Sequence, residues 1–340
     1  MASSTLHSER TRLPWFGLTL LVTALGALAL AAVYVSRINP EVRFQNGLWS
    51  IKRAAVARLR RVPRPEGVIV ATAGSSGMFG IDVLRLQQTH GLPLANLAMG
   101  AGLGAGVLIE SAVSETQPGD TLLLVLEPFL LTDPQTPPSL GIQFSLACEH
   151  REWVTRPTFG QPRVPLASAW LALRPGGRHC VTMLAKLIAR REPFRYRLAD
   201  VDAGGLVQTD TRVTLEGPPL LADHLDPEAV KMLAALRDWG RARKVRIIYT
   251  LPWSYCPEAG LPEYRRQHAA YLRDVSRYIL VLKEPSFGAH SVVGDFADSV
   301  WHLNRETAAL RSDELGRALR ANSFWTTEEL DRLARTGMSP

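Results

Sequence analysis

The sequence is poor in cysteine, and its cysteines form no recognisable motif. Among the 340 residues there are three, Cys148, Cys180 and Cys256, and no two of them stand in a CxxC spacing. This odd number and wide spacing argue against a metal site and allow one internal disulfide at most. Buried free thiols account for the three residues equally well.

Aromatic residues are also few, at 7% of the chain, although the protein is basic, with a net charge of +7. A basic protein suits contact with anionic surfaces or polymers. Domains that bind nucleic acid add a recognisable motif to their basic residues, and none accompanies them here. We therefore expect no nucleic-acid partner. The hydrophobic share of 46% is normal for a packed core and argues against disorder.

The apolar stretch from Leu13 to Val35 contains no charged side chain. At about 1.5 Å per residue, it is long enough to cross a hydrocarbon core of about 30 Å. Trp15 and Tyr34 lie near its two ends, where aromatic residues anchor a spanning helix. A cleaved signal peptide is the alternative, because residues 27–31 resemble a small-residue cleavage site. We favour an uncleaved transmembrane helix, because the apolar run continues past that site.

This span separates an N-terminal tail, residues 1–12, from a basic stretch, residues 36–65. In that stretch the apolar residues recur at helical spacing, which predicts a basic amphipathic stalk. The stalk can lie on anionic headgroups, bind a partner or simply connect two parts of the chain. Basic residues flank the span on both sides, so charge alone leaves the orientation in the membrane open. The basic residues of the stalk include Lys52, Arg53, Arg58, Arg60 and Arg61.

Residues 66–340 alternate strand-like and helix-like segments, which predicts an α/β domain with a mostly parallel sheet. The interval at about residues 132–224 is rich in proline and glycine and breaks the alternation. We expect an insertion there that forms a lid over the strand ends or a partner surface. The expected strands cover residues 67–70, 92–99, 121–126, 245–251 and 278–283.

The insertion contains aromatic and basic residues that could line a carbohydrate groove. The alternative is that these residues form the small core of the insertion itself. They are Trp153, Arg156, Phe159, Trp170, Arg174, Phe194, Arg195 and Tyr196.

The first expected strand runs into a glycine- and serine-rich turn, residues 74–77. Ligands of open α/β sheets bind outside the carboxyl ends of the strands. Ser76 can therefore face a substrate. An ordinary turn is the simpler interpretation, since serine and glycine are common turn residues.

An acid and a histidine stand close together near the C-terminus, in the segment DSVWHLN that begins at Asp298. His302 can take a proton from a hydroxyl group, and an acid beside it can fix its tautomer and stabilise the imidazolium ion. Ser76, Asp298 and His302 thus occur in a sensible order for a catalytic triad. A structural histidine before a helix is the alternative.

Together these stretches resemble the SGNH/GDSL hydrolase-like superfamily, particularly its membrane-anchored branch associated with polysaccharide or cell-wall O-acylation. The run GSSGMFGID, residues 74–82, is similar to a block of that branch. The resemblance implies a three-layer α/β/α flavodoxin-like sandwich with Ser76 as nucleophile, His302 as base and Asp298 as orienting acid. It also implies that the enzyme needs no cofactor or metal and that its domain faces the periplasm or the exterior.

The resemblance extends to the two blocks that hold an oxyanion in the superfamily. Asn96 opens a stretch similar to the second block, where Gly100 or Gly102 would supply a backbone N–H. Asn96 itself is a candidate substrate contact. The third block usually carries an asparagine, but Glu127 stands there, and an ionised carboxylate cannot donate a hydrogen bond. Glu127 is then a protonated donor, a substrate contact or the structural partner of an arginine.

These features predict a single-pass protein of the inner membrane that moves an acetyl group on or off an extracellular or periplasmic polysaccharide, with transfer and hydrolysis both open. A multi-span membrane acyltransferase or a glycan synthase is the expected partner. The alternative is a degenerate domain that serves as an accessory or scaffold subunit of a polysaccharide synthase or secretion complex. The absent asparagine, the stalk and the insertion all allow that alternative.

Overall fold

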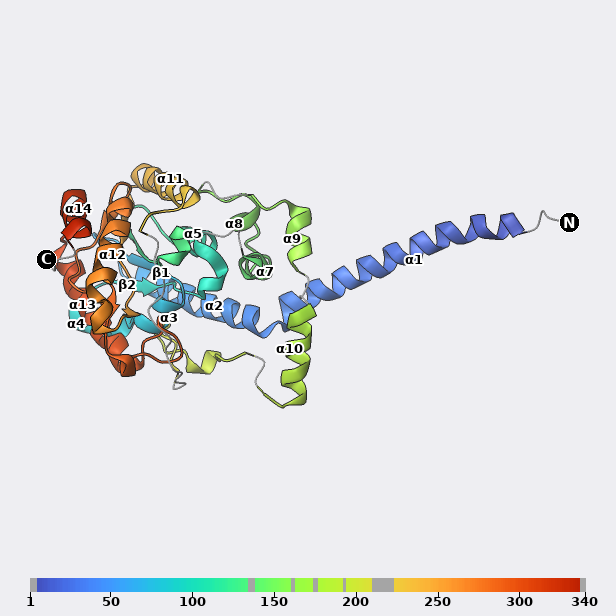
Figure 1. Ribbon diagram of the computed structural model, residues 1–340, viewed down its shortest axis with the longest axis horizontal. Helices are drawn as coiled ribbons and strands as arrows, with labels where there is room; N and C mark the ends of the chain where they lie inside the picture. Colours follow the sequence, from blue (N-terminus) through green and yellow to red (C-terminus); the bar gives the residue numbers. More distant parts are fainter. Residues whose placement is uncertain are drawn as a thin grey trace.

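A computed structural model places a long N-terminal helix in front of an α/β domain (Figure 1). Helix α1 (Thr5–Val33) continues into a short π-helix, η1 (Tyr34–Ile38), and projects away from the domain. The segment Trp15–Ile38 is long and apolar enough to cross a membrane, and only 6% of its most apolar window is buried. The expected apolar helix is therefore present, close to the predicted bounds. The structure describes residues 5–133, 138–159, 163–173, 177–191, 194–209 and 223–336.

The predicted stalk forms a helix that is part of the domain. Helix α2 (Pro40–Arg60) begins at Asn39, whose side chain accepts a hydrogen bond from the N–H of Glu41. Its apolar face packs into the main core, beside β2. Lys52, expected on the polar side, is 1% exposed. The helix is thus no solvated connector, because its apolar stripe is broad enough to cover the sheet edge. The buried residues of α2 are Val42, Phe44, Gln45, Leu48, Trp49, Lys52 and Val56.

Five strands form one sheet in the order β2-β1-β3-β4-β6, and all four pairings are parallel. The predicted α/β class with a mostly parallel sheet is confirmed. The chain runs outward from β1 to β2 and then crosses back to β3, so the strand order reverses at the β1/β3 boundary. Ligands of such sheets bind at this reversal. The strands are β1 (Ile69–Ala73), β2 (Leu94–Asn96), β3 (Thr121–Val125), β4 (Arg246–Tyr249) and β6 (Leu280–Val281).

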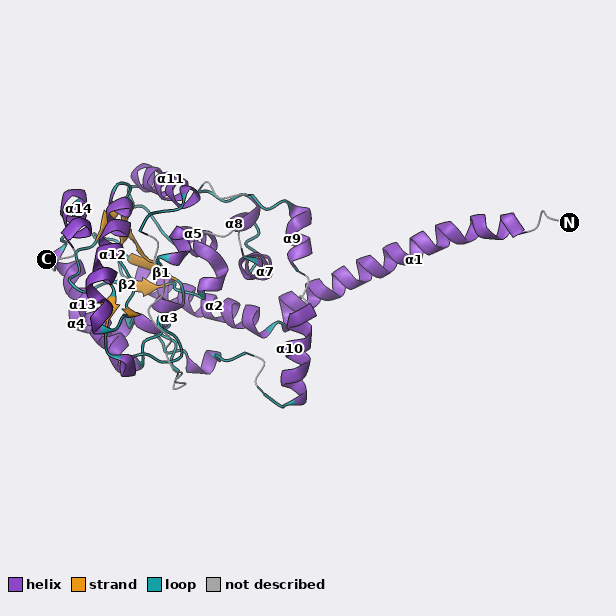
Figure 2. Ribbon diagram, viewed as in Figure 1, coloured by secondary structure: helices purple, strands orange, loops and turns teal. Residues whose placement is uncertain are grey.

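Helices surround the sheet, as Figure 2 shows. Helix α5 (Gly104–Ser114) packs on β1 and β3, α11 (Pro227–Arg243) on β4, and α12 (Leu261–Ser276) on β6. Crossovers between parallel strands are right-handed. That rule places α4 (Val83–His90), which lies in the β1–β2 crossover, on the face opposite these three helices. The last helices are α13 (Arg305–Ala321), which packs on α3 and α4, and α14 (Thr327–Thr336), which packs on α12.

The described parts of the insertion are largely helical. Trp153 and Phe159 are buried in the main core, so they do not line a groove. Arg174 and the side chain of Trp170 lie outside the described residues. The helices are α6 (Phe129–Thr132), α7 (Ser139–Ala147), α8 (Glu152–Thr155), α9 (Leu166–Ala172), α10 (Gly177–Ile188) and η3 (Leu198–Asp200). The remaining short elements are η2 (Ala101–Leu103), β5 (Ser254–Tyr255), η4 (Glu258–Gly260), β7 (Ala289–His290) and η5 (Val293–Asp295).

Candidate active site

Ser76 lies in the first turn of α3 (Ser75–Gly80), directly after strand β1, which pairs with β2 on one side and β3 on the other. Two glycines allow this helix to start so close to the sheet. A Cβ atom on Gly74 would lie 2.3 Å from a carboxylate oxygen of Glu127, and one on Gly77 would lie 2.3 Å from the Cβ of Ala73. Ser76 is 3% exposed, and its Oγ has no hydrogen-bond partner within the described residues. A buried hydroxyl without a hydrogen-bond partner costs folding free energy, so its presence needs an explanation such as a catalytic role.

Glu127 follows β3 and reaches across to the start of α3. Its Oε1 accepts a hydrogen bond of 2.8 Å from the N–H of Ser76, and its Oε2 accepts one of 3.1 Å from the N–H of Gly74. Burial raises the pKa of Glu127, and the N–H of Ser76 and the nearby His302 oppose that rise. Of the three roles expected for Glu127, pairing with an arginine is not observed in the described part of the chain. Its carboxylate accepts hydrogen bonds from the backbone instead.

Asp298 and His302 form the pair that the sequence predicts. The distance between Oδ1 of Asp298 and Nδ1 of His302 is 2.6 Å. Burial raises the pKa of Asp298, but the hydrogen bond and charge of His302, together with the hydrogen bond of Tyr196 and the charge of Arg195, hold it below its ordinary value. An ionised Asp298 accepts the proton on Nδ1, which leaves Nε2 of His302 free to act as a base. This is the tautomer that a triad requires.

The imidazole of His302 rests against the helix that contains Ser76. It stacks on Phe79, with ring centroids 4.2 Å apart and planes inclined by 24°. Phe79 follows Ser76 by three residues in α3, so the two side chains lie on one helix face. Within the described ranges, no hydrogen bond joins Ser76 Oγ to His302. Such catalytic hydrogen bonds are often long without substrate. The structure thus brings the three residues to one place.

Two further site residues come from the insertion and were not singled out as catalytic by the sequence. Arg195 Nη1 and Tyr196 OH donate hydrogen bonds of 2.6 and 2.7 Å to Oδ2 of Asp298. The Tyr196 ring also packs on Phe79. Both contacts join residues about a hundred positions apart in the chain, so no local sequence pattern predicts them. The segment 194–209, which we call the strap, therefore covers the site.

The expected oxyanion residues are engaged within the protein. Gly100 donates its N–H to Oε1 of Gln45 in α2, at 3.1 Å. Gly102 is exposed and lies near Leu140. The N–H of Ser76 likewise donates to Glu127. Two of the three candidate oxyanion donors, Gly100 and Ser76, therefore already donate to a side-chain oxygen.

Asn96 is 1% exposed, and its side chain connects the end of β2 to helix α3. Its Nδ2 donates to the carbonyl oxygens of Gly77 and Ile81, at 2.9 and 3.3 Å, and its Oδ1 accepts from the N–H of Ala98, at 2.9 Å. These bonds tie the end of β2 to both ends of α3. Its contacts are those of a residue that positions Ser76.

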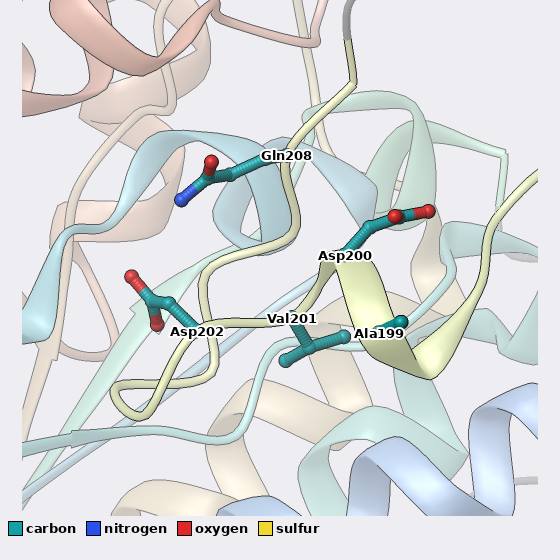
Figure 3. A pocket seen from close by; sticks show the side chains of 5 residues that line it. All are labelled: Ala199, Asp200, Val201, Asp202 and Gln208. Atoms are coloured by element: carbon teal, nitrogen blue, oxygen red, sulfur yellow. The ribbon is translucent and has the colours of Figure 1, made fainter.

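Two open hollows lie along the strap, and neither is lined by Ser76, Asp298 or His302. One, of about 280 Å³, is lined by Ala199, Asp200, Val201, Asp202 and Gln208 (Figure 3). In Figure 3, Asp202 and Gln208 point to the same side of the strap and Asp200 points to the other. The second, of about 380 Å³, is lined by Gln208, Thr209, Phe296, Ala297, Asn304, Arg305 and Glu306.

No group of three or more His, Cys, Asp or Glu side chains in the described ranges could hold a metal ion. Cys148, Cys180 and Cys256 form no disulfide among the described residues. Burial raises the pKa of Cys148 to about 12, which makes it a poor nucleophile at neutral pH.

Comparison of the chain with protein-family models, with curated proteins and with solved structures found no significant match in any of the three.

Proposed function

We propose that the protein is a membrane-anchored serine enzyme of SGNH type that transfers an acetyl group to or from a polysaccharide. The observation that carries this proposal is the 2.6 Å pair of Asp298 and His302, stacked against the helix in which Ser76 Oγ has no described partner. The run GSSGMFGID supports the SGNH assignment. The sheet order β2-β1-β3-β4-β6 supports it too, because it is the flavodoxin-like order that this fold uses.

The reaction has two halves. His302 Nε2 takes the proton of Ser76 Oγ as the oxygen attacks the acetyl carbonyl, and Asp298 stabilises the imidazolium ion. Collapse of the tetrahedral intermediate breaks the bond to the donor's oxygen, which receives the proton from His302, and leaves an acetyl ester on Ser76. A polysaccharide hydroxyl or water then gives its proton to His302 and attacks the ester, and Ser76 recovers its hydrogen. No cofactor takes part in these steps.

The apolar helix α1 would hold this enzyme in the inner membrane, with its domain on the periplasmic or outer side, where the polymer lies. That side follows from the SGNH resemblance. A multi-span acyltransferase or a glycan synthase is the partner that this arrangement favours, because an acetyl donor has to reach the outer side of the membrane.

One observation favours a second candidate, an accessory subunit without catalysis. The N–H of Ser76, which would hold the oxyanion, donates to Glu127 instead. A buried carboxylate at that position repels a developing oxyanion. A protein that retained the SGNH fold as a scaffold for a synthase or secretion complex would tolerate this arrangement.

Replacement of Ser76 separates the two candidates. We expect Ser76→Ala to change polymer acetylation in cells, with a loss if the enzyme adds acetyl groups and an increase if it removes them, and to abolish labelling by a serine-directed phosphonate. Ser75→Ala is the matched control, because it changes the neighbouring helical residue and should leave both measurements intact. Unchanged acetylation in folded Ser76→Ala protein would rule out the catalytic assignment.

A wild-type protein that never reacts with the phosphonate would favour the accessory subunit. If the protein is labelled, a chromogenic acetyl ester offered with and without a sugar acceptor tells transfer from hydrolysis, because only a transferase forms acetylated sugar.

A further inference from the structure

Helix α10 presents its apolar side to the outside of the protein. Its apolar residues Val181, Leu184, Leu187 and Ile188 are between 58% and 75% exposed. At about 100° per residue, all four fall within an arc of about 120° on one side of the helix. A surface helix of a soluble domain buries such a stripe. This stripe has no partner within the part of the chain that the structure describes.

The opposite side of α10 faces the protein. Met183 and Lys186 are partly buried there. Burial raises the pKa of Glu41, and the charge of Lys186 opposes that rise, so the two groups lie close together. The helix is therefore docked by the side that carries its charge, and its apolar side points outward.

Helix α10 lies where the surface of a membrane around α1 would be. Helix α10 lies crosswise to α1, at the place where α1 meets the domain (Figure 1). Cys180 in α10 lies near enough to Tyr34 to affect its ionisation, and Tyr34 stands near the domain-side end of the apolar segment Trp15–Ile38. At about 1.5 Å per residue, that segment crosses a core of about 30 Å. A bilayer around α1 would thus have its interface beside α10.

We propose that α10 is a second membrane contact, an interfacial helix that lies in the plane of the bilayer with Val181, Leu184, Leu187 and Ile188 in the lipid. Arg190 and Arg191 follow the helix at an exposed position, where they fit anionic headgroups. Lipid is the occupant because α10 lies at the domain end of the apolar segment Trp15–Ile38, the level at which a bilayer around that segment would end. With two contacts, the domain cannot turn freely about α1, so the strap and the site keep a fixed direction relative to the membrane.

Spin-label accessibility in the full-length protein tests this contact, independently of any enzymatic activity. The protein is reconstituted in nanodiscs that contain anionic lipid, in a Cys180→Ser background whose own labelling is subtracted. Labels are placed by Leu184→Cys and Leu187→Cys. We expect collisions with oxygen, which concentrates in lipid, to exceed collisions with a water-soluble nickel chelate at both positions.

Two control positions provide reference values for oxygen and nickel accessibility. Leu310→Cys places a label on an equally exposed apolar position in α13, at the end of the domain far from α1, and nickel collisions should dominate there. Ala189→Cys directly follows α10, outside its apolar arc, and should give lower oxygen accessibility than Leu187→Cys. Nickel accessibility at Leu184 and Leu187 equal to that at Leu310 would place α10 in water and overturn the proposal. Low accessibility to both reagents would also overturn it, because a protein partner would then cover the helix.

Discussion

At the scale of single residues, Glu127 controls what Ser76 can do. Its carboxylate holds the N–H groups of Ser76 and Gly74, and a transition-state oxyanion needs the first of them. A negative charge beside that oxyanion raises the barrier to attack. A neutral side chain of the same shape removes this repulsion.

We therefore expect Glu127→Gln to speed phosphonate labelling of Ser76 at neutral pH by about tenfold, the equivalent of about 1.4 kcal/mol. The rate of labelling, measured at several pH values, checks this. Glu110→Gln, which neutralises another buried carboxyl group in α5, should leave the rate unchanged. Slower labelling of Glu127→Gln would mean that the carboxylate itself supports the active geometry of α3.

Lys52 is a buried cation without a hydrogen-bond partner for its Nζ in the described residues. Burial lowers its pKa to about 7, and the charge of Asp202 opposes this only in part. The unfolded chain, with the ordinary value of 10.5, binds the proton more tightly than the folded protein does. The resulting cost to stability is complete below pH 7, falls as the pH rises, and vanishes above about pH 10.5.

Lys52→Met keeps the shape of the side chain and removes this cost. We expect it to raise the free energy of unfolding by a few kcal/mol at pH 6.5, with a gain that shrinks steadily towards pH 10. Thermal unfolding in detergent at the two pH values measures both effects. Arg53→Met, on the exposed side of the same helix, should change stability by less than about 1 kcal/mol at either pH. A gain that does not depend on pH would show that the pKa of Lys52 is the same in the folded and the unfolded protein.

Sequence reasoning reached Asp298 and His302 because they lie four residues apart, so one local segment contains their whole interaction. It did not reach the contacts of Tyr196 with Asp298 or of Gln45 with Gly100, which join segments far apart in the chain. A tyrosine or glutamine in a helix or loop has no periodicity that marks it. The same limit explains Lys52, because its burial depends on the strap that crosses over it.

At the scale of elements, each predicted strand coincides with an observed one, because buried parallel strands are continuous apolar runs. The run 92–99 gives only a three-residue strand, β2, although the N–H groups of Leu97 and Met99 beyond it still donate to carbonyl oxygens of β1. Helices α7 and α10 were not predicted. Proline and glycine around them suggested irregular structure. In addition, the apolar residues of α10 lie on its exposed side, so they do not mark the side that packs on the domain.

One ion pair ties α13 to the ends of two strands. Arg311 and Glu284 are both almost fully buried and pair at 2.5 Å, and Arg311 also donates to the carbonyl oxygen of Leu251 at 2.9 Å. Thr250, next to the end of β4, donates to the same carboxylate. Removal of one partner leaves a buried charge unpaired, which costs more than the pair gains.

We expect Arg311→Met to lower the free energy of unfolding by about 3–5 kcal/mol, as measured by urea unfolding in detergent. The double variant Arg311→Met with Glu284→Leu should recover a large part of that loss, since it leaves no unpaired charge. Arg266→Met, which breaks an exposed pair with Glu263, should have an effect below about 1 kcal/mol. If Arg311→Met were as mild as Arg266→Met, water would have to reach Glu284.

At the scale of the whole molecule, the sequence predicts two parts, an apolar helix and an α/β domain, from composition and alternation alone. It does not predict how they join. Helix α2 belongs to the core, so the apolar helix ends at the surface of the domain, with only the π-helix η1 between them. A bilayer around α1 would therefore lie close to α9 and α10, which flank that end of α1 (Figure 1).

This arrangement predicts two kinds of membrane attachment with different strengths. Helix α1 should resist extraction, whereas an interfacial helix such as α10 binds reversibly. A charged residue at the centre of a span costs about 2.5–3.5 kcal/mol on an insertion scale. We expect the double variant Leu21→Arg with Leu25→Arg to leave the membrane pellet in alkaline carbonate, which the wild-type protein resists. At neutral pH the same variant should still bind anionic liposomes weakly through α10.

Leu310→Arg is the control, because it adds the same charge to an exposed leucine far from α1 and should remain in the pellet. Sedimentation followed by immunoblotting measures all three proteins. A double variant that stays in the pellet after carbonate would show that α1 is not the element that holds the protein. A variant that fails to bind liposomes at neutral pH would leave α1 as the sole contact, and the domain would then be free to rotate above the membrane.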